Sequence, residues 1–317
     1  MFVIFFLINT IIVKILLSNH HFSEVGGSEV WVYNMALNLN KLGYKVDLFI
    51  DQDFHRPSNI FLLEDQFKSK INVFTVNPPV DQYDLIIANH TSTINKLVSI
   101  YRPEIIIQTC HGIIPSLERP HPALKNFVSV SKEVQQHLKN KGFNSVVIEN
   151  SIDCELFRDN YPINERLHSV LSLAQDSRAA NMIQQACDRM NLQFKQRSKF
   201  HRYNLNIQDE INEADLVVSV GRGVLESLGC GRNVVSLDAR SYYTSVPMGY
   251  GLLDSEEKIK YALSDNFTGR NGGEIFTTEK LIDEFQKYRK EYEVMGRNYI
   301  LNKHNIINNI NKYLCLL

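Results

Sequence analysis

Short apolar runs rich in β-branched residues alternate with helical patterns along this chain, in two successive series. This alternation is typical of parallel β-sheets whose strands are connected by helices. The first series predicts seven strands, at residues 14–18, 44–50, 71–76, 84–89, 104–109, 127–130 and 145–149. We therefore expect a seven-stranded sheet in the first half of the chain.

The segment after the first predicted strand has the apolar spacing of a helix. Its stripe, at intervals of four, four and three residues, is formed by Trp31, Met35, Leu39 and Leu42. Gly43 follows directly, where a left-handed residue commonly ends a helix. The first 50 residues therefore predict a strand–helix–strand unit.

The pattern breaks at residues 150–159, where polar residues predict a linker. A second series then begins, with strands predicted at 168–173, 192–195, 215–220 and 233–237, a helix at 177–190, and polar helices from Thr277 onward. A chain of 317 residues fits two domains of about 150 residues each. We place the first domain at residues 14–155 and the second at 156–317, with the last helix a candidate for packing back on the first.

Composition narrows the class of protein. Hydrophobic residues make up 44% and charged residues 22%, the ordinary mixture of a globular protein. A net charge of -1 supplies no global basic field, which argues against nucleic acid as a partner. The five cysteines are scattered and never spaced C-x-x-C, which favours free thiols in a reducing compartment and argues against a zinc site. We expect a cytoplasmic protein.

Residues 1–13 form an apolar run that stops at Lys14. The run is shorter than the ~20 residues needed to span a bilayer, and it has neither a basic leader nor a small-residue cleavage site. We interpret it as an extension of the fold. The alternative is peripheral association with a membrane, on its cytoplasmic face.

The strongest chemical signal lies between two predicted strands of the second series. The strand at 215–220 leads into Gly221, Arg222 and Gly223, and a short helix carries Glu226. Such a turn presents backbone N–H groups at a helix N-terminus, which favours a diphosphate, and Arg222 adds a full charge. Glu226 is placed to accept hydrogen bonds from ribose hydroxyls. The alternative is a tight turn with a solvated glutamate.

The stretch GRGVLESLGCGRNVV resembles the donor-site segment of family 4 glycosyltransferases. The resemblance implies a GT-B fold, an α/β architecture of two Rossmann-like domains facing each other across a cleft. It also implies that Glu226 binds the ribose of a nucleotide sugar. The family's first glutamate, which contacts the transferred sugar, is replaced by Val218, as in a GRG-type subgroup that lacks it. The nucleotide-binding residues are then Gly221, Arg222, Gly223, Val224, Leu225 and Glu226.

Other segments resemble the same family in the same order. Gly26 and Gly27 match its glycine loop beside the cleft, and His111, in TCHGI, matches a histidine that reaches the sugar. Arg178 matches one member of the family's cationic pair for the diphosphate, without the lysine that usually follows. NFTGR, at residues 266–270, is a phrase of the same subgroup to which we assign no chemistry.

The resemblance implies a glycosyltransferase that moves a sugar from a nucleoside-diphosphate sugar to a hydroxyl of a glycan or lipid-linked acceptor, with retention at the anomeric carbon. His111 and Glu226 are its candidate catalytic residues, and no metal or other cofactor is expected. Three alternatives remain open: a sugar-nucleotide epimerase of the same fold, a non-catalytic glycan- or nucleotide-binding protein, and a nicotinamide oxidoreductase. The last would need a full glycine fingerprint, whose third glycine is missing after Gly26 and Gly27.

Overall fold

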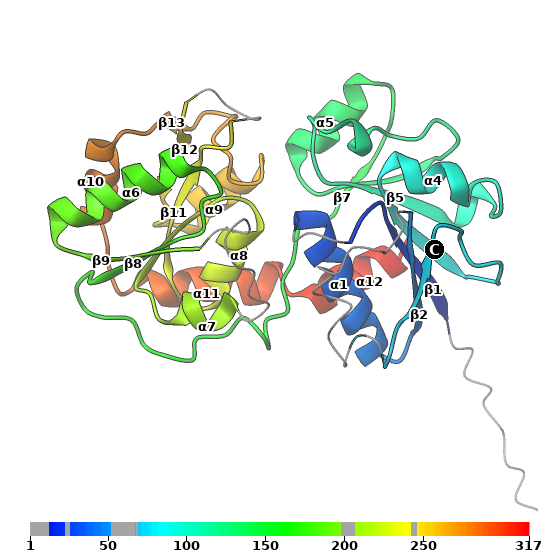
Figure 1. Cartoon of the computed structure of the whole chain (residues 1–317), viewed down its shortest axis with the longest axis horizontal. Helices are drawn as coiled ribbons and strands as arrows, with labels where there is room; N and C mark the ends of the chain where they lie inside the picture. Colours follow the sequence, from blue (N-terminus) through cyan, green and yellow to red (C-terminus); the bar gives the residue numbers. More distant parts are fainter. Residues whose placement is uncertain are drawn as a thin grey trace, which may run out of the picture.

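The computed structural model describes residues 13–22, 26–51, 67, 69–197, 207–241 and 246–316. The chain forms two β-sheets, each covered by helices, which lie side by side (Figure 1). We call each sheet with its helices a domain. Residues 1–12 of the apolar run lie outside the described residues.

The first sheet contains seven parallel strands in the order β3-β2-β1-β4-β5-β6-β7, which confirms the predicted number. The strands are β1 (Lys14–Asn19), β2 (Lys45–Ile50), β3 (Asn72–Thr75), β4 (Leu85–Asn89), β5 (Ile106–Cys110), β6 (Asn126–Ser129) and β7 (Val146–Val147). The central strands β1, β4 and β5 are buried almost throughout because helices cover both faces of the sheet, which is why their sequences are nearly continuous apolar runs.

The helices and short 3₁₀ turns of the first domain are α1 (Gly27–Lys41), α4 (Thr91–Leu97), α5 (Lys132–Asn140), η1 (Pro103–Ile105) and η2 (Ser116–Glu118). The predicted stripe of α1 is confirmed at Trp31, Met35 and Leu39, which enter the core. It is wrong at Leu42, which is 43% exposed. Leu42 is the residue after the last helical turn, and the backbone turns away at Gly43, whose φ is 92°.

The second sheet has six strands in the order β13-β12-β11-β10-β8-β9. They are β8 (Ser169–Ser172), β9 (Gln193–Gln196), β10 (Leu216–Ser219), β11 (Asn233–Asp238), β12 (Met248–Leu252) and β13 (Glu274–Ile275). The four parallel strands were predicted, whereas the antiparallel pair β12 and β13 was not. The sequence of β12 contains two glycines, which weaken any strand pattern.

The helices of the second half are α6 (Ser177–Met190), α7 (Ile207–Asn212), α8 (Arg222–Gly229), α9 (Glu256–Leu263), α10 (Thr278–Gln286), α11 (Tyr292–Lys303) and α12 (Ile306–Leu314). Helix α12 lies against α1 of the first domain (Figure 1). Its residue Tyr313 packs edge-on against Trp31, with ring centroids 5.8 Å apart, and its hydroxyl lies 3.1 Å from Oγ1 of Thr109. Within the described ranges, no helix has the length and apolarity that crossing a bilayer requires.

The chain passes from the first domain to the second near Ile152 and returns near His304, and these two crossings lie side by side. The backbone N–H of Ile152 donates to the carbonyl of His304 at 2.9 Å, and the N–H of Ile306 donates to the carbonyl of Ile152 at the same distance. The ring of His304 adds a hydrogen bond from Nδ1 to the carbonyl of Asn150 at 2.9 Å. The outgoing and returning segments are therefore bonded to each other where they pass.

Candidate functional site

The first turn of α8 is built around two glycines. Gly221 has φ 63° and ψ -131°, a backbone conformation that is largely restricted to glycine. A Cβ atom on Gly223 would lie 2.3 Å from Oγ of Ser219 and 3.3 Å from Cδ1 of Leu173, so its absence lets the helix start close against the sheet. The helix therefore begins directly at the carboxyl edge of β10. The N–H of Val224 donates to the carbonyl of Gly221, and the N–H groups before it have no partner within the helix.

Arg222 and Glu226 form an ion pair one turn apart on α8. Nε of Arg222 lies 2.6 Å from Oε1 of Glu226, and each side chain is only 11% exposed. Nη1 of Arg222 donates to the carbonyl of Ser151 at 3.2 Å, which connects α8 to the segment between the domains. Nη2 of Arg222 is buried without a hydrogen-bond partner. Burial raises the pKa of Glu226, and the neighbouring guanidinium opposes that shift.

Val224 and Leu225 do not present their side chains to a ligand. Both are fully buried in the core of the second domain. Val218 is also fully buried, in register with Val235 and Ser172 on the neighbouring strands. A carboxylate at position 218 would therefore lie inside this sheet, so the missing first glutamate is compatible with the way this chain packs.

Arg178 lies at the same edge of the second sheet, in the first turn of α6. Its backbone N–H and its Nε both donate to Oδ1 of Asp176, the N-cap residue, at 2.8 and 3.2 Å. Its Nη2 donates to the carbonyl of Ala239, at 3.0 Å, just after β11. The side chain is 47% exposed. The role of Arg178 as a donor ligand stays a prediction.

His111 follows β5 at the carboxyl edge of the first sheet. Its Nε2 lies 3.0 Å from Oδ1 of Asn89, and its backbone N–H donates to Oε2 of Glu118 at 2.6 Å. The ring meets Trp31 edge-on, with centroids 5.4 Å apart. Burial lowers the pKa of His111 to about 4, and Arg222 of the second domain contributes to that decrease while Glu118 opposes it. His111 is therefore neutral at pH 7, and it lies within electrostatic range of α8.

Three further histidines and two buried carboxylates share this edge with His111, and sequence reasoning did not single them out: His20, His21, His90, Glu29 and Glu118. Nε2 of His21 lies 3.0 Å from Oε1 of Glu29, and Nε2 of His90 lies 3.5 Å from Oε1 of Glu118. Although burial would raise it, the hydrogen bond from His90 holds the pKa of Glu118 below its usual value. The only available signal was that each histidine lies within three residues of the end of a predicted strand.

The glycine loop leads into α1 at the same edge. A Cβ atom on Gly26 would lie 2.4 Å from Oε2 of Glu29, whereas one on Gly27 would meet nothing within 4 Å. Gly27 is thus not required for packing, and any need for a glycine there would come from a ligand.

The segment 264–271, which includes NFTGR, lies between the two domains. Asp265, fully buried, accepts hydrogen bonds from the backbone N–H groups of Thr268 and Asn271. The amide nitrogen of Asn266 lies 3.4 Å from the position of a Cβ on Gly221, so this loop borders the first turn of α8. Arg270 bonds to Glu133 of the first domain. The phrase to which sequence reasoning assigned no chemistry is therefore a domain contact beside the predicted donor site.

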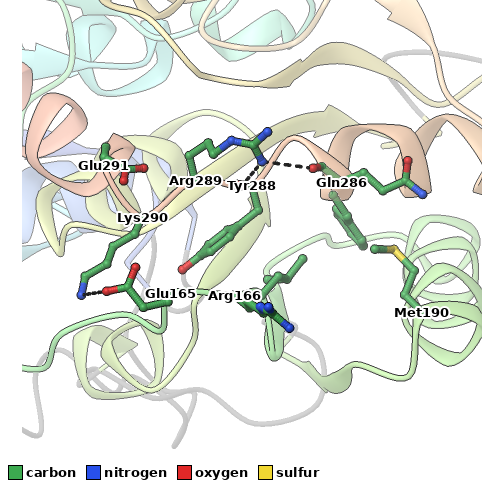
Figure 2. A pocket seen from close by; sticks show the side chains of 10 residues that line it. Glu165, Arg166, Met190, Gln286, Tyr288, Arg289, Lys290 and Glu291 are labelled. Atoms are coloured by element: carbon green, nitrogen blue, oxygen red, sulfur yellow. Dashed lines mark hydrogen bonds and ion pairs between the residues drawn. The ribbon is translucent and has the colours of Figure 1, made fainter.

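A separate cavity of about 330 Å³ lies at the opposite edge of the second sheet. Its lining includes Glu165, Arg166 and Met190 (Figure 2). Glu165 and Arg166 precede β8, which runs parallel to β10. Glu165 and Lys290 form a 2.8 Å ion pair there. This cavity is apart from the residues predicted to bind a donor.

Among the residues that the structure describes, no group of three or more His, Cys, Asp or Glu side chains is arranged to hold a metal ion.

Comparisons with known proteins identify the fold. No protein-family model matches the chain, and no curated protein sequence matches it significantly. A glycosyltransferase structure from Rickettsia africae aligns with a TM-score of 0.60 at 14% identity, over 96% of this chain and 97% of that one. An alpha-glucosyltransferase in complex with UDP and a 13-mer DNA aligns with a TM-score of 0.61 at 12% identity, over 96% and 98%.

A third solved structure belongs to a putative UDP-N-acetylglucosamine 2-epimerase from Listeria monocytogenes. It aligns with a TM-score of 0.55 at 11% identity, over 95% of each chain. Identities this low show the fold and no more. The chain has the predicted GT-B fold, with two Rossmann-like α/β domains facing each other.

Proposed function

We propose that this chain is a glycosyltransferase that transfers a sugar from a nucleoside-diphosphate sugar to an acceptor hydroxyl. The observation that carries the proposal is the start of α8, where Gly221 and Gly223 bring a helix N-terminus to the sheet edge beside a buried guanidinium group of Arg222 that keeps one unpartnered nitrogen. Backbone N–H groups and an arginine are the groups that bind a diphosphate. The resemblance of residues 221–235 to the donor segment of family 4 glycosyltransferases, in its GRG-type subgroup, supports the same assignment.

In this mechanism the second domain holds the donor. The dipole of α8 and the charge of Arg222 stabilise the negative charge that develops on the departing diphosphate, which needs no metal ion. Glu226 accepts hydrogen bonds from the ribose and also holds Arg222 in place. His111, Gly26 and Gly27 on the first domain border the sugar and the acceptor, which we propose is a glycan or a lipid-linked saccharide. By the family resemblance, transfer proceeds with retention.

Thermal-shift measurements with UDP-, GDP- and ADP-sugars test this proposal. We expect at least one of them to raise the melting temperature, in the presence of EDTA as well as in its absence. Product analysis with that donor and a mixture of oligosaccharide acceptors then tests transfer. A protein that binds none of the three classes would contradict the proposed donor site.

A sugar-nucleotide epimerase is the second candidate, because Glu29 and Glu118 are buried carboxylates at the edge of the first sheet that faces α8. Carboxylates near the sugar are what proton transfer on the sugar ring would require. Incubation with the donor alone separates the two functions. An isomerised nucleotide sugar would favour the epimerase, and an unchanged donor that is consumed only with an acceptor would favour the transferase.

A further inference from the structure

A directed chain of hydrogen bonds runs under the first-domain edge and ends at His111. Nδ2 of Asn19 donates to the backbone carbonyl of His21 at 2.6 Å, and Nδ2 of Asn89 donates to Oδ1 of Asn19 at 3.2 Å. Oδ1 of Asn89 then faces Nε2 of His111 at 3.0 Å. Asn19 and Asn89 are fully buried.

The carbonyl at the far end fixes the direction of the whole chain. A backbone carbonyl can only accept, so Asn19 must present its NH₂ group to it and its oxygen to Asn89. Asn89 must then present its own NH₂ to Asn19, which leaves its oxygen for His111. The hydrogen on Nε2 of His111 is therefore specified, because the other tautomer would bring two acceptors together.

The surroundings keep this ring neutral and fixed in place. The charged and titratable groups that act on it are Glu118, His90, Glu29 and Arg222, and burial outweighs them. The edge-on contact with Trp31 and the Glu118 bond to the backbone N–H of His111 hold the ring and its strand end. A neutral imidazole with its proton on Nε2 has a lone pair on Nδ1 and can offer no proton there.

We propose that Asn19 and Asn89 are positioning residues that hold His111 as its Nε2–H tautomer, so that Nδ1 accepts a hydrogen bond from a hydroxyl of the bound sugar. This inference rests on the proposed function and sharpens it. His111 orients the sugar as an acceptor, and does not polarise it by donating a proton. A carboxylate or phosphate oxygen at this position would face the lone pair of Nδ1, so the site selects a ligand group that can donate.

Nitrogen NMR of the full-length, ¹⁵N-labelled protein tests the inference without any substrate. The chain has ten histidines, so the signals of His111 are assigned by their loss in His111→Gln. At pH 7 we expect a protonated Nε2 and an unprotonated Nδ1. With the signals assigned in this way, the spectrum of the wild-type protein decides the tautomer even if a variant of Asn19 or Asn89 fails to fold.

Asn89→Asp supplies a second readout, which a purely structural role would not change. It places a carboxylate about where Oδ1 lies now, 3.0 Å from Nε2, and so favours the charged imidazolium. The pKa of His111 should rise by about 1–3 units. Asn126→Asp is the matched control, because Asn126 bonds to the carbonyl of Glu104 at the opposite edge of the same sheet.

A wild-type spectrum with a protonated Nδ1 would overturn the inference. An unchanged His111 pKa in Asn89→Asp, or an equal rise in Asn126→Asp, would overturn it too. If no nucleotide sugar bound, the proposed function would be overturned. The NMR result on the free protein would still stand, so the two failures can be told apart.

Discussion

Arg270 and Glu133 form a two-bond ion pair that joins the two domains. Nε and Nη2 of Arg270 lie 2.8 and 2.6 Å from Oε1 and Oε2 of Glu133, and the two side chains are 20% and 12% exposed. The backbone N–H of Glu133 also donates to the carbonyl of Ser264 at 2.9 Å. The first turn of α5 is therefore attached to the loop that borders α8.

The first prediction concerns this contact. Arg270→Ala leaves the carboxylate of Glu133 partly buried without its partner, so we expect a loss of about 1–3 kcal/mol in stability and a lower melting temperature. Arg189→Ala is the control, because the ion pair of Arg189 with Glu279 is exposed, and we expect no measurable change. Equal melting temperatures for Arg270→Ala and the wild type would contradict the assigned contact.

The second prediction concerns Glu226. Glu226→Ala removes the proposed ribose acceptor and the partner that holds Arg222, so a nucleotide sugar that stabilises the wild type should stabilise this variant less. Glu226→Gln, which retains an acceptor oxygen without charge, should lie between the two. Glu256→Ala in the exposed first turn of α9 is the control. Equal thermal shifts in the wild type and Glu226→Ala would count against the ribose contact.

The third prediction is a loss of stability in mild acid. Burial lowers the pKa of His304 from 6.5 to about 4. Its Nε2 is buried without a hydrogen-bond partner, so an N–H group formed there by protonation would have no acceptor. Between about pH 6.5 and pH 4 the unfolded chain therefore takes up a proton that the folded chain does not, and the free energy of unfolding falls as the pH falls. His111 acts in the same direction.

Melting temperatures measured from pH 7 to pH 4.5 check this prediction. His304→Gln should weaken the dependence on pH in that window, whereas His168→Gln, which replaces an exposed side chain, should leave the curve unchanged in shape. A wild-type melting temperature that stays constant down to pH 4.5 would show that the imidazole of His304 is not buried as described.

The fourth prediction uses the glycine loop. Because a Cβ on Gly27 meets nothing within 4 Å, Gly27→Ala should fold with the stability of the wild type. If the loop approaches a ligand closely, the same variant should raise the KM for the donor or the acceptor. Gly221→Ala should instead lose stability, by about 1–3 kcal/mol, because its backbone conformation is strained for any other residue. Unchanged kinetics in Gly27→Ala would remove this loop from the proposed site.

Most of the sheet architecture was predictable because the apolar runs of buried parallel strands are long and clear. The strand at Met248–Leu252 was missed because its two glycines break the run of apolar residues that marks a strand. In the folded chain a Cβ on Gly249 would lie 2.0 Å from the carbonyl oxygen of Ser236. Those glycines are explained by close approach to a neighbouring strand, which only the folded chain reveals.

The candidate site was predictable in part. Glycines and a charged pair after a strand indicated the start of α8, since that signal is local in sequence. The Asn19–Asn89–His111 chain could not be predicted, because its members are 70 and 22 residues apart and meet only through the strand order of the sheet. For the same reason the contact of Arg270 with Glu133, 137 residues apart, gave no local signal.

Helix α12 supplies Ile306, Ile310 and Tyr313 to the core of the first domain, although the chain reaches it only after completing the second. A ribosome releases the first domain's strands long before this helix emerges. The site that Tyr313 fills beside Trp31 and Thr109 then stays open to water until the residues of the second domain have been synthesised. The core of the first domain is therefore completed only after the residues of the second domain have been synthesised.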